Sequence, residues 1–268
     1  MATLRELKKR LRSTETTGQL AGAMRTVATA KYSKVSAAHN ACTPYLEALA
    51  GCGSGTALPR GEKAGVPVYV LFSGNRGLCG GFHHELFAFL SETLKGESEF
   101  ALVPCGRMAA EYCREKKLPV LKEFFPADVP DFTDAKALAS FLTELYRSGE
   151  ANSIDFVYQR FYNMLRQKPE KTRFLPEEGE NAVDGELIFF PDRETVESEL
   201  APLSLAAECY SVLLSSASGA QAATVMAMRS AYDNAEASSR KLNVEINRLR
   251  QAAVTSSVIE TASDTRND

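Results

Sequence analysis

A glycine-rich loop is the first place in the chain where chemistry is conceivable. Ser73–Phe82, with the sequence SGNRGLCGGF, follows a short apolar run and precedes a segment of helical character. Backbone amides of a loop in this position can cradle a phosphate group. The loop has neither the G-x-x-x-x-G-K-[ST] pattern of a P-loop nor the G-x-G-x-x-G pattern of a dinucleotide site. We therefore favour a tight structural turn. The alternative, a phosphate-using enzyme, predicts saturable nucleotide binding by the isolated chain.

A second candidate is a metal site, because Cys79, His83, His84 and Glu85 lie close together in the sequence. Adjacent histidines point to different faces of a helix, however, and no second ligand pair is evident. We expect a solvated helix start here. The chain has three histidines in all, and no Ser/His/Asp or Cys/His constellation has a supporting pattern. The sequence therefore predicts no catalytic residue, no cofactor site and no metal site.

The charge balance argues against a globally basic nucleic-acid binder, because 31 Lys and Arg residues face 34 Asp and Glu residues. The local exception is residues 5–12, which carry five basic side chains. Nucleic acid is one partner for such a run. No aromatic residues are interleaved with it, so an acidic protein surface fits at least as well.

Three further expectations concern the compartment. No stretch approaches the roughly 18–20 uncharged apolar residues that cross a bilayer, so we expect that the chain does not itself span a membrane. The basic N-terminus lacks an apolar core, so we expect no signal peptide. Six cysteines without a C-x-x-C pair are expected to be free thiols in a reducing compartment.

The first zone, from Met1 to about Leu49, is predicted to be one long helix, since it contains a single proline and two glycines. Alternating steps of 3 and 4 residues give a mainly apolar seam, which requires a partner helix. The seam consists of Leu4, Leu7, Leu11, Thr14, Gly18, Ala21, Arg25, Ala28, Tyr32, Val35, His39, Cys42, Leu46 and Leu49.

The last zone, from about Pro202 to the end, is predicted to be a second long helix with a seam of the same kind. Its positions are Leu203, Ala207, Tyr210, Leu214, Ala217, Gln221, Thr224, Met228, Ala231, Ala235, Ser238, Leu242, Glu245, Leu249, Ala252, Ser256 and Ile259. Both seams are rich in small residues, so the two helices could approach each other closely.

Between these zones lies an α/β pattern. A Gly- and Pro-rich linker, residues 51–65, precedes alternating strands and helices that run to about Pro191, which argues for a sheet that is at least partly parallel. The predicted strands are VPVYVLF, FALVPCG, LPVLKEFF, SIDFVYQRFYN and GELIFFP, and the predicted helices are residues 83–95, GRMAAEYCREKK and DAKALASFLTELYRS. The resulting segments are an N-terminal coiled-coil helix (1–57), a central α/β domain (58–195) and a C-terminal coiled-coil helix (196–268).

Several runs together carry a family resemblance. They are TGQLAGAMRTVATAKYSKV, NRGLCGGF, MAMRSAYDNA and NRLRQAAVTSSVIE, which occur in this order from near the first residues to near the end. The chain resembles the gamma subunit of F-type ATP synthase. The resemblance implies an antiparallel coiled coil of the two terminal helices inside a ring of three alpha and three beta subunits. It also implies a central, Rossmann-like α/β domain outside that ring.

The function implied by this resemblance is mechanical. Ion flow turns a c-ring, the gamma shaft turns with it, and its asymmetric surface drives the beta subunits through states that make or hydrolyse ATP. Catalysis then belongs to the beta subunits, so this chain is a non-catalytic subunit without a cofactor. The implied partners are the alpha, beta and epsilon subunits and the c-ring. Nucleic acid is not among them, and membrane contact is only through the c-ring. The implied location is the cytoplasmic face of a bacterial inner membrane, as a peripheral subunit.

The resemblance also assigns roles to individual residues. Met24 matches a methionine that lies beside the beta subunit. Arg250, Gln251 and Thr255 match a segment that hydrogen-bonds to a beta-subunit loop, and Glu260 matches a later acidic residue. Guanidinium and amide groups suit such contacts. The structural alternative is that these are exposed polar residues on the flank of a coiled coil.

The chain departs from the family pattern at several positions. Thr224 stands where the family usually has Arg, Gly219 replaces the usual Glu, and Ser257 replaces an acidic residue. The tail ETASDTRND is polar where the family usually ends in small apolar residues. We therefore expect a looser grip at the end of the shaft.

Two further assignments complete the sequence predictions. A foot that contacts the c-ring and epsilon is expected in the central domain and near Leu205 and Tyr210. Thiol regulation is not expected, because Cys105 and Cys113 fall in an ordinary strand and helix. The competing function is a coiled-coil scaffold or adaptor with a ligand-binding α/β domain, which helical periodicity alone would also allow.

Overall fold

The computed structural model describes residues 3–51, 65–176, 190 and 192–264. The backbone divides into two units. The terminal unit comprises Met1–Val27 and Val225–Asp268, and the central unit comprises Ala28–Thr224. The three-segment division at residues 57/58 and 195/196 is based on composition and remains a prediction.

Two long helices are present, as the sequence predicts. Helix α1 extends over Leu4–Gly51 and α5 over Arg193–Asp264. Helix α5 starts at Arg193, which is nine residues before Pro202, where the predicted helical zone begins, and three before residue 196, the predicted segment boundary. Pro202 therefore lies inside the helix. Asp192 explains the earlier start, since its carboxylate accepts hydrogen bonds from the Thr195 amide at 2.8 Å and the Thr195 hydroxyl at 2.9 Å.

In the terminal unit, small residues bring the two helices into close antiparallel contact. A Cβ added at Gly18 would lie 3.2 Å from the Cβ of Ala235, and one at Gly22 would lie 3.4 Å from the Tyr232 ring. As numbers rise along α1 they fall along α5, so the helices are antiparallel. The same register places Leu7 opposite Ile246, and both side chains are buried.

The seam prediction is confirmed for α1 and only partly for α5. Each of the predicted α1 positions is buried or half-buried. On α5, Ala235 and Leu242 are buried or half-buried, but Ser238 and Glu245 are exposed, and Ser239 and Ile246 take their places. The predicted seam, with strictly alternating steps of 4 and 3 residues, is wrong for this part of α5. The helix turns the bulky apolar Ile246 inward and leaves the charged Glu245 in water.

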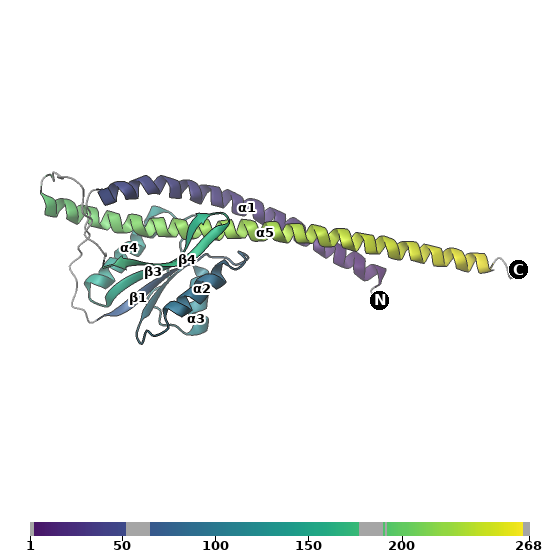
Figure 1. The fold of residues 1–268 in the computed structure, drawn as a ribbon, viewed down its shortest axis with the longest axis horizontal. Coiled ribbons are helices and arrows are strands. Elements are labelled where there is room, and N and C mark those ends of the chain that lie inside the picture. The colour runs from purple at the N-terminus through teal and green to yellow at the C-terminus, as the bar shows by residue number, and fades with distance from the viewer. Residues whose placement is uncertain (1–2, 52–64, 177–189, 191, 265–268) are drawn as a thin grey trace. The chain divides into compact units, whose positions relative to one another are not determined.

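The sheet of the central unit has the strand order β2-β1-β3-β4. Figure 1 labels three of these strands, β1, β3 and β4. Its strands are β1 (Val66–Phe72), β2 (Ala101–Cys105), β3 (Ala151–Asn163) and β4 (Arg166–Leu175). Strand β1 pairs in parallel with β2 and β3, and β3 pairs with β4 as an antiparallel hairpin. The expectation of a partly parallel sheet is therefore confirmed.

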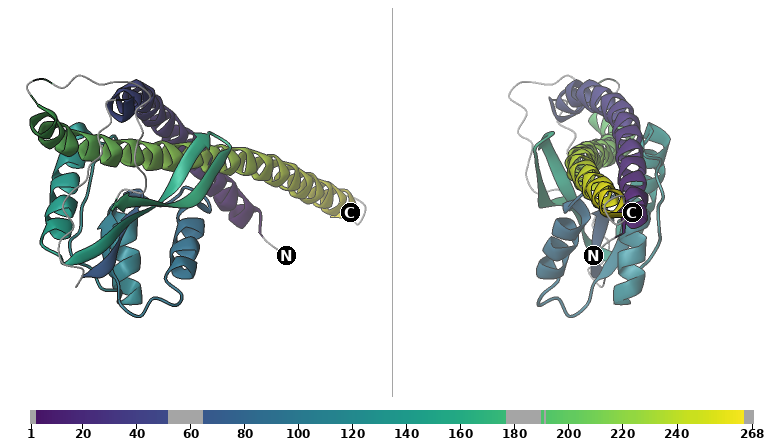
Figure 2. Two further views of the ribbon diagram at one scale, coloured as in Figure 1. Left: turned by 60° about the vertical axis from the view of Figure 1, so that its left-hand side comes forward. Right: turned by 90° about the vertical axis from the view of Figure 1, so that its right-hand side faces the viewer.

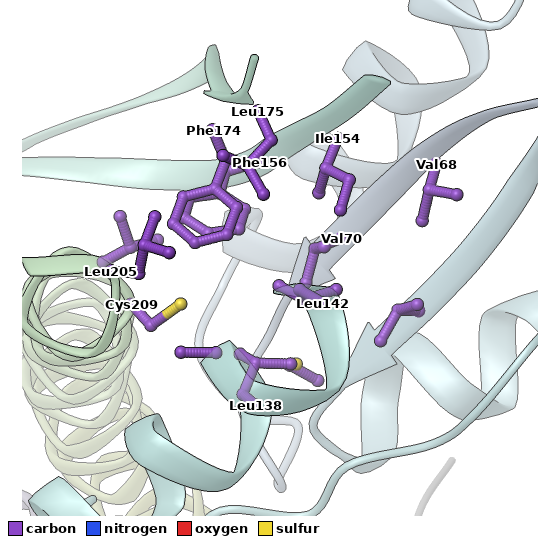
Figure 3. Close-up of a cluster of buried hydrophobic side chains, with 14 of the residues drawn as sticks. Val68, Val70, Leu138, Leu142, Ile154, Phe156, Phe174, Leu175, Leu205 and Cys209 are labelled. Carbon is purple, nitrogen blue, oxygen red and sulfur yellow. The ribbon is translucent and has the colours of Figure 1, made fainter. Parts of the chain in front are cut away.

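Helices cover both faces of this sheet, and successive side chains of β1 point to opposite faces. Helices α2 (Phe82–Thr93) and α3 (Arg107–Lys116) cover the face of Tyr69 and Leu71 (Figure 2). Helix α4 (Phe132–Arg147) and the Leu205–Leu213 part of α5 cover the face of Val68 and Val70. Figure 3 shows the core on this second face, where the Phe156 and Phe174 rings stack with centroids 4.3 Å apart. The part of α5 in the central unit is therefore a core element of the α/β layers.

The sequence located most of these elements but not all. It missed β4, whose charged sequence RQKPEKTRFL has little apolar alternation. LPVLKEFF forms only isolated parallel bridges at Val120 and Phe124. Most of the predicted strand GELIFFP and most of the predicted 51–65 linker lie outside the described residues.

Helix α5 also has membrane-like composition. Within Ser198–Ile259, an 18-residue window reaches a mean hydropathy of 1.3, which suffices by length and composition to cross a bilayer. The expectation that no stretch approaches this character is therefore wrong. Half of that window is buried within the fold. The core helix of a soluble protein can have the same length and apolar composition as a membrane-spanning helix.

Candidate partner-binding surfaces

The glycine-rich loop satisfies the N-terminus of α3 with its own acceptors. The Arg107 amide donates to Asn75 Oδ1 at 3.1 Å, and the Ala109 amide donates to Ser73 Oγ at 2.8 Å. Between them, the Met108 amide donates to the Gly74 carbonyl at 3.2 Å. These amides are the groups with which a helix would bind a phosphate. Because the loop occupies them, the geometry favours the structural turn over a phosphate site.

His83 is buried, so the expectation of a solvated helix start is wrong for this residue. Its ring stacks on Phe87, and its Nε2 lies 3.2 Å from the Arg76 carbonyl oxygen. Burial lowers the pKa of His83. His84 is exposed. Within residues 3–51, 65–176, 190 and 192–264, no group of three or more His, Cys, Asp or Glu side chains could hold a metal ion.

The same loop helps to attach α1 to the α/β layers of the central unit. Lys31 of α1 forms an ion pair with Asp128, which lies just before α4. Asn75 Nδ2 donates to Asp128 Oδ1 at 3.4 Å, and Arg76 lies 3.7 Å from the same carboxylate. Partial burial opposes ionisation of Asp128, but Lys31, Asn75 and Arg76 outweigh it and lower the pKa of this carboxyl group. No local sequence pattern predicts this cluster, because its members are far apart along the chain.

Helix α5 is fixed to the sheet by buried serines and a glycine. Ser215 Oγ accepts a hydrogen bond from the Phe161 amide at 3.0 Å, and the Ser216 hydroxyl donates to the Phe72 carbonyl at 3.4 Å. Gly219 lies against Phe82, where an added Cβ would be 2.9 Å from the ring. A larger side chain at this site would displace Phe82.

The predicted beta-contact residues all lie in the terminal unit. Met24 of α1 is half-buried, whereas Arg250, Gln251 and Thr255 of α5 are exposed. The Thr255 hydroxyl donates to the Gln251 carbonyl at 2.9 Å, within its own helix. Glu260 lies in α5, but its side chain is outside the described part of the chain. The fold thus presents three of the five side chains to solvent.

Helix α5 is also apolar on its surface in this segment. Every described side chain over residues 250–259 is exposed, including Val254, Val258 and Ile259 at 58%, 62% and 61%. By the register of the helix pair, Leu4, the first residue of α1, lies opposite Leu249. Helix α1 therefore does not extend alongside residues 250–259 of α5. Exposed apolar groups of this kind mark a surface that another protein covers.

At the other end of α5, the two predicted foot residues differ in exposure. Leu205 is only 3% exposed and belongs to the core, whereas Tyr210 is half-buried with its ring edge-on to Phe132 at 5.6 Å. Burial, with the nearby Cys42 and Asp131, raises the pKa of Tyr210. Nearby, Leu203 is exposed. A groove of about 540 Å³ between α4 and α5 is lined by residues that include Leu205 and Arg147.

The described cysteines are free and buried. Burial, with a contribution from Glu123, raises the pKa of Cys113 to about 11, and burial also raises that of Cys105. Because the thiolate is the reactive form, these thiols are poor redox partners. Cys52 lies outside the described residues.

Comparison with known proteins agrees over almost the whole chain. The sequence model of the ATP synthase family matches residues 3–264. The ATP synthase gamma chain of Moorella thermoacetica is 33% identical, and the alignment covers 97% of both chains. That of Desulforamulus reducens is 30% identical, again with 97% of both chains covered.

Solved structures share the fold at low sequence identity. The chain resembles part of the rotor of the Euglena gracilis mitochondrial ATP synthase with a TM-score of 0.69 and 15% identity, over 94% of this chain and 98% of the other. It also resembles part of the central stalk and c-ring structure from Tetrahymena thermophila, with a TM-score of 0.62 and 19% identity, over 79% and 99% of the two chains. The chain therefore belongs to the gamma chain family of ATP synthase, and its role is that of the central rotor shaft.

Proposed function

We propose that this chain turns inside a ring of three alpha and three beta subunits and couples c-ring rotation to the catalytic cycle of the beta subunits. The observation that carries the proposal is the antiparallel helix pair of the terminal unit, in which Gly18 and Gly22 allow close contact with Ala235 and Tyr232. A tightly packed pair resists twisting better than a single helix does. Such a pair can therefore carry torque.

Coupling also requires that the shaft bind the different conformational states of the beta subunits with unequal affinity. Equal affinity would not shift the equilibrium between those states. The surfaces of the two helices meet this need. The first turns of α1 carry the basic residues of positions 5–12, whereas α5 exposes Val254, Val258 and Ile259. A ring subunit therefore meets a different surface as the shaft turns.

Met24, Arg250, Gln251, Thr255 and Glu260 contact the beta subunits in this proposal. The exposure of Arg250, Gln251 and Thr255 supports it, since their side chains are accessible to a partner. Arg250 supplies up to five N–H donors, and Gln251 supplies both a donor and an acceptor. These groups suit a beta-subunit loop that offers backbone carbonyls and carboxylates.

The opposite end of α5 contacts the c-ring and epsilon in this proposal, near Leu205 and Tyr210. The buried Leu205 would act through the packing of the helix, and its exposed neighbour Leu203 would make the direct contact. The F1 part of ATP synthase, to which the gamma chain belongs, is peripheral to the membrane. For this chain we infer the cytoplasmic face of a bacterial inner membrane, which the bacterial origin of its relatives supports.

The test is to express this chain with its cognate alpha and beta subunits and to label the shaft for single-molecule rotation. A stable complex with one copy of the chain, ATP hydrolysis and ATP-driven stepping are expected. If the alpha and beta subunits hydrolyse ATP equally with and without the chain and no complex forms, the proposal fails. The scaffold or adaptor function would then be the better interpretation.

A further inference from the structure

The β3–β4 hairpin exposes basic and apolar side chains around its turn. Strand β3 turns into β4 at Met164 and Leu165, where the Leu165 amide donates to Asn163 Oδ1 at 2.9 Å. Leu165 is 80% exposed, and Tyr162 is exposed as well. Residues 160–171 contain four basic and one acidic side chain, a net charge of +3.

Tyr162 is held by its basic neighbours. The Arg160 and Arg166 guanidinium carbons lie 5.9 and 5.1 Å from the centre of its ring. Arg160 also forms an ion pair with Glu170 at 2.9 Å, which holds the Arg160 guanidinium group beside the Tyr162 ring. Arg166 is exposed. Tyr and Arg are among the residue types that contribute most binding energy at protein interfaces, and holding them in place before binding reduces the entropy lost on contact.

The base of the hairpin is attached to both long helices within the central unit. The Phe161 ring meets Tyr32 of α1 edge-on at 5.9 Å, and the Phe161 amide donates to Ser215 of α5. Gln167 packs near Gly219, whose added Cβ would lie 3.4 Å from Gln167 Cγ. Figure 1 shows the hairpin beside α5. A force on the hairpin turn is thus passed to both helices.

We propose that the turn of this hairpin, residues 160–168, is a docking surface for an acidic protein segment carried by another subunit of the assembled complex. This inference rests on the rotor function proposed above. Carboxylates of the partner pair with Arg166 and Lys168, and apolar side chains next to them cover Leu165 and Tyr162. The positive charge selects an acidic partner, because like charges in contact are strongly unfavourable.

The first experiment places a photoreactive benzophenone side chain at Leu165 in the assembled complex. The matched control places it at Leu121, another exposed leucine of the central unit. We expect a crosslink from position 165 to an acidic segment of a neighbouring subunit, at a yield several-fold above that of the control. Crosslinks confined to this chain, or to co-purified nucleic acid, would overturn the proposal.

The second experiment reverses charge without touching the anchored base. Arg166→Glu is expected to lower both the crosslinking yield and ATP-driven stepping at least threefold at low salt, with a smaller difference at high salt. Lys136→Glu, on the exposed face of α4, is expected to change neither. Equal yield and stepping for Arg166→Glu and the unaltered chain would mean that these charges only protect a sheet edge. Failure of the unaltered chain to assemble would instead reject the rotor function itself.

Discussion

Gly219 of α5 lies so close to Phe82 that a Cβ would stand 2.9 Å from the ring atom Cε2. Phe82 is the last residue of the glycine-rich loop and the first of α2, and its carbonyl accepts a hydrogen bond from Gln159 Nε2 at 3.0 Å. The absence of a side chain at position 219 therefore lets α5, the loop and β3 pack together. Gly219 itself is buried and is part of this packed region.

Gly219→Ala is expected to destabilise the chain by about 1–2 kcal/mol. Overpacking against Phe82 costs about 1–3 kcal/mol, and the better helix propensity of Ala offsets up to about 1 kcal/mol. Urea unfolding measures the effect. Gly77→Ala is the control, because a Cβ there meets nothing within 4 Å. A Gly219→Ala chain as stable as the control would show that the ring moves freely aside.

Gly106→Ala is expected to cost at least about 3 kcal/mol, since it combines a left-handed backbone with a steric clash. Gly106 has φ of +103°, and its Cβ would lie 2.3 Å from the Ser73 carbonyl oxygen. Gly96 has φ of +95° in open space, so Gly96→Ala isolates the backbone cost of about 1–2 kcal/mol. Equal losses for the two variants in thermal unfolding would contradict the role of the Ser73 contact.

Asp128→Asn is expected to lower stability at pH 7 by about 1–2 kcal/mol, because it removes a partly buried, charge-assisted pair with Lys31. The pKa of Asp128 is lowered in the folded chain. Its stabilisation is therefore fully present above the unfolded-state pKa and is lost as the pH falls through the folded-state pKa. Urea unfolding at several pH values should show the two chains converging in acid. Glu92→Gln, in an exposed pair with Lys95, should cost about 0–0.5 kcal/mol.

Arg250→Ala is expected to leave the stability of the isolated chain within about 0.5 kcal/mol, because its side chain is exposed. In the assembled complex it should lower ATP-driven rotation about tenfold, which corresponds to the loss of one charge-assisted hydrogen bond to a beta subunit. Arg248→Ala is the matched control, since Arg248 is equally exposed but is not a predicted contact. Similar rates for both variants would remove Arg250 from the contact set.

The polar C-terminal tail is expected to weaken the grip of the ring on the end of the shaft. Replacing ETASDTRND by a run of Ala and Leu should raise the stall torque of the complex, because apolar groups would then be buried in the ring. Stall torque is measured by single-molecule rotation against a calibrated load. Equal torque for the natural and the apolar tail would refute this expectation, and Val254, Val258 and Ile259 would then suffice for the grip.

The sequence alone determined the elements whose signals are local. Proline-poor zones with small and apolar residues at helical spacing predicted α1 and α5, and short apolar runs between helical segments predicted β1, β2 and β3. The ordered family runs, together with the two helices, predicted the shaft role. These predictions succeed because helix propensity and apolar periodicity act over a few neighbouring residues.

Only the tertiary structure decided the features that join distant segments. The charged strand β4 exists because β3 offers it a pairing edge, and α5 exposes Glu245 because Ile246 packs inward. Lys31 meets Asp128, and Gly219 meets Phe82, across 97 and 137 residues of sequence. Burial of His83 and Leu205 depends likewise on which layers cover them. Energies of this kind arise from packing and desolvation between elements, so no local pattern records them.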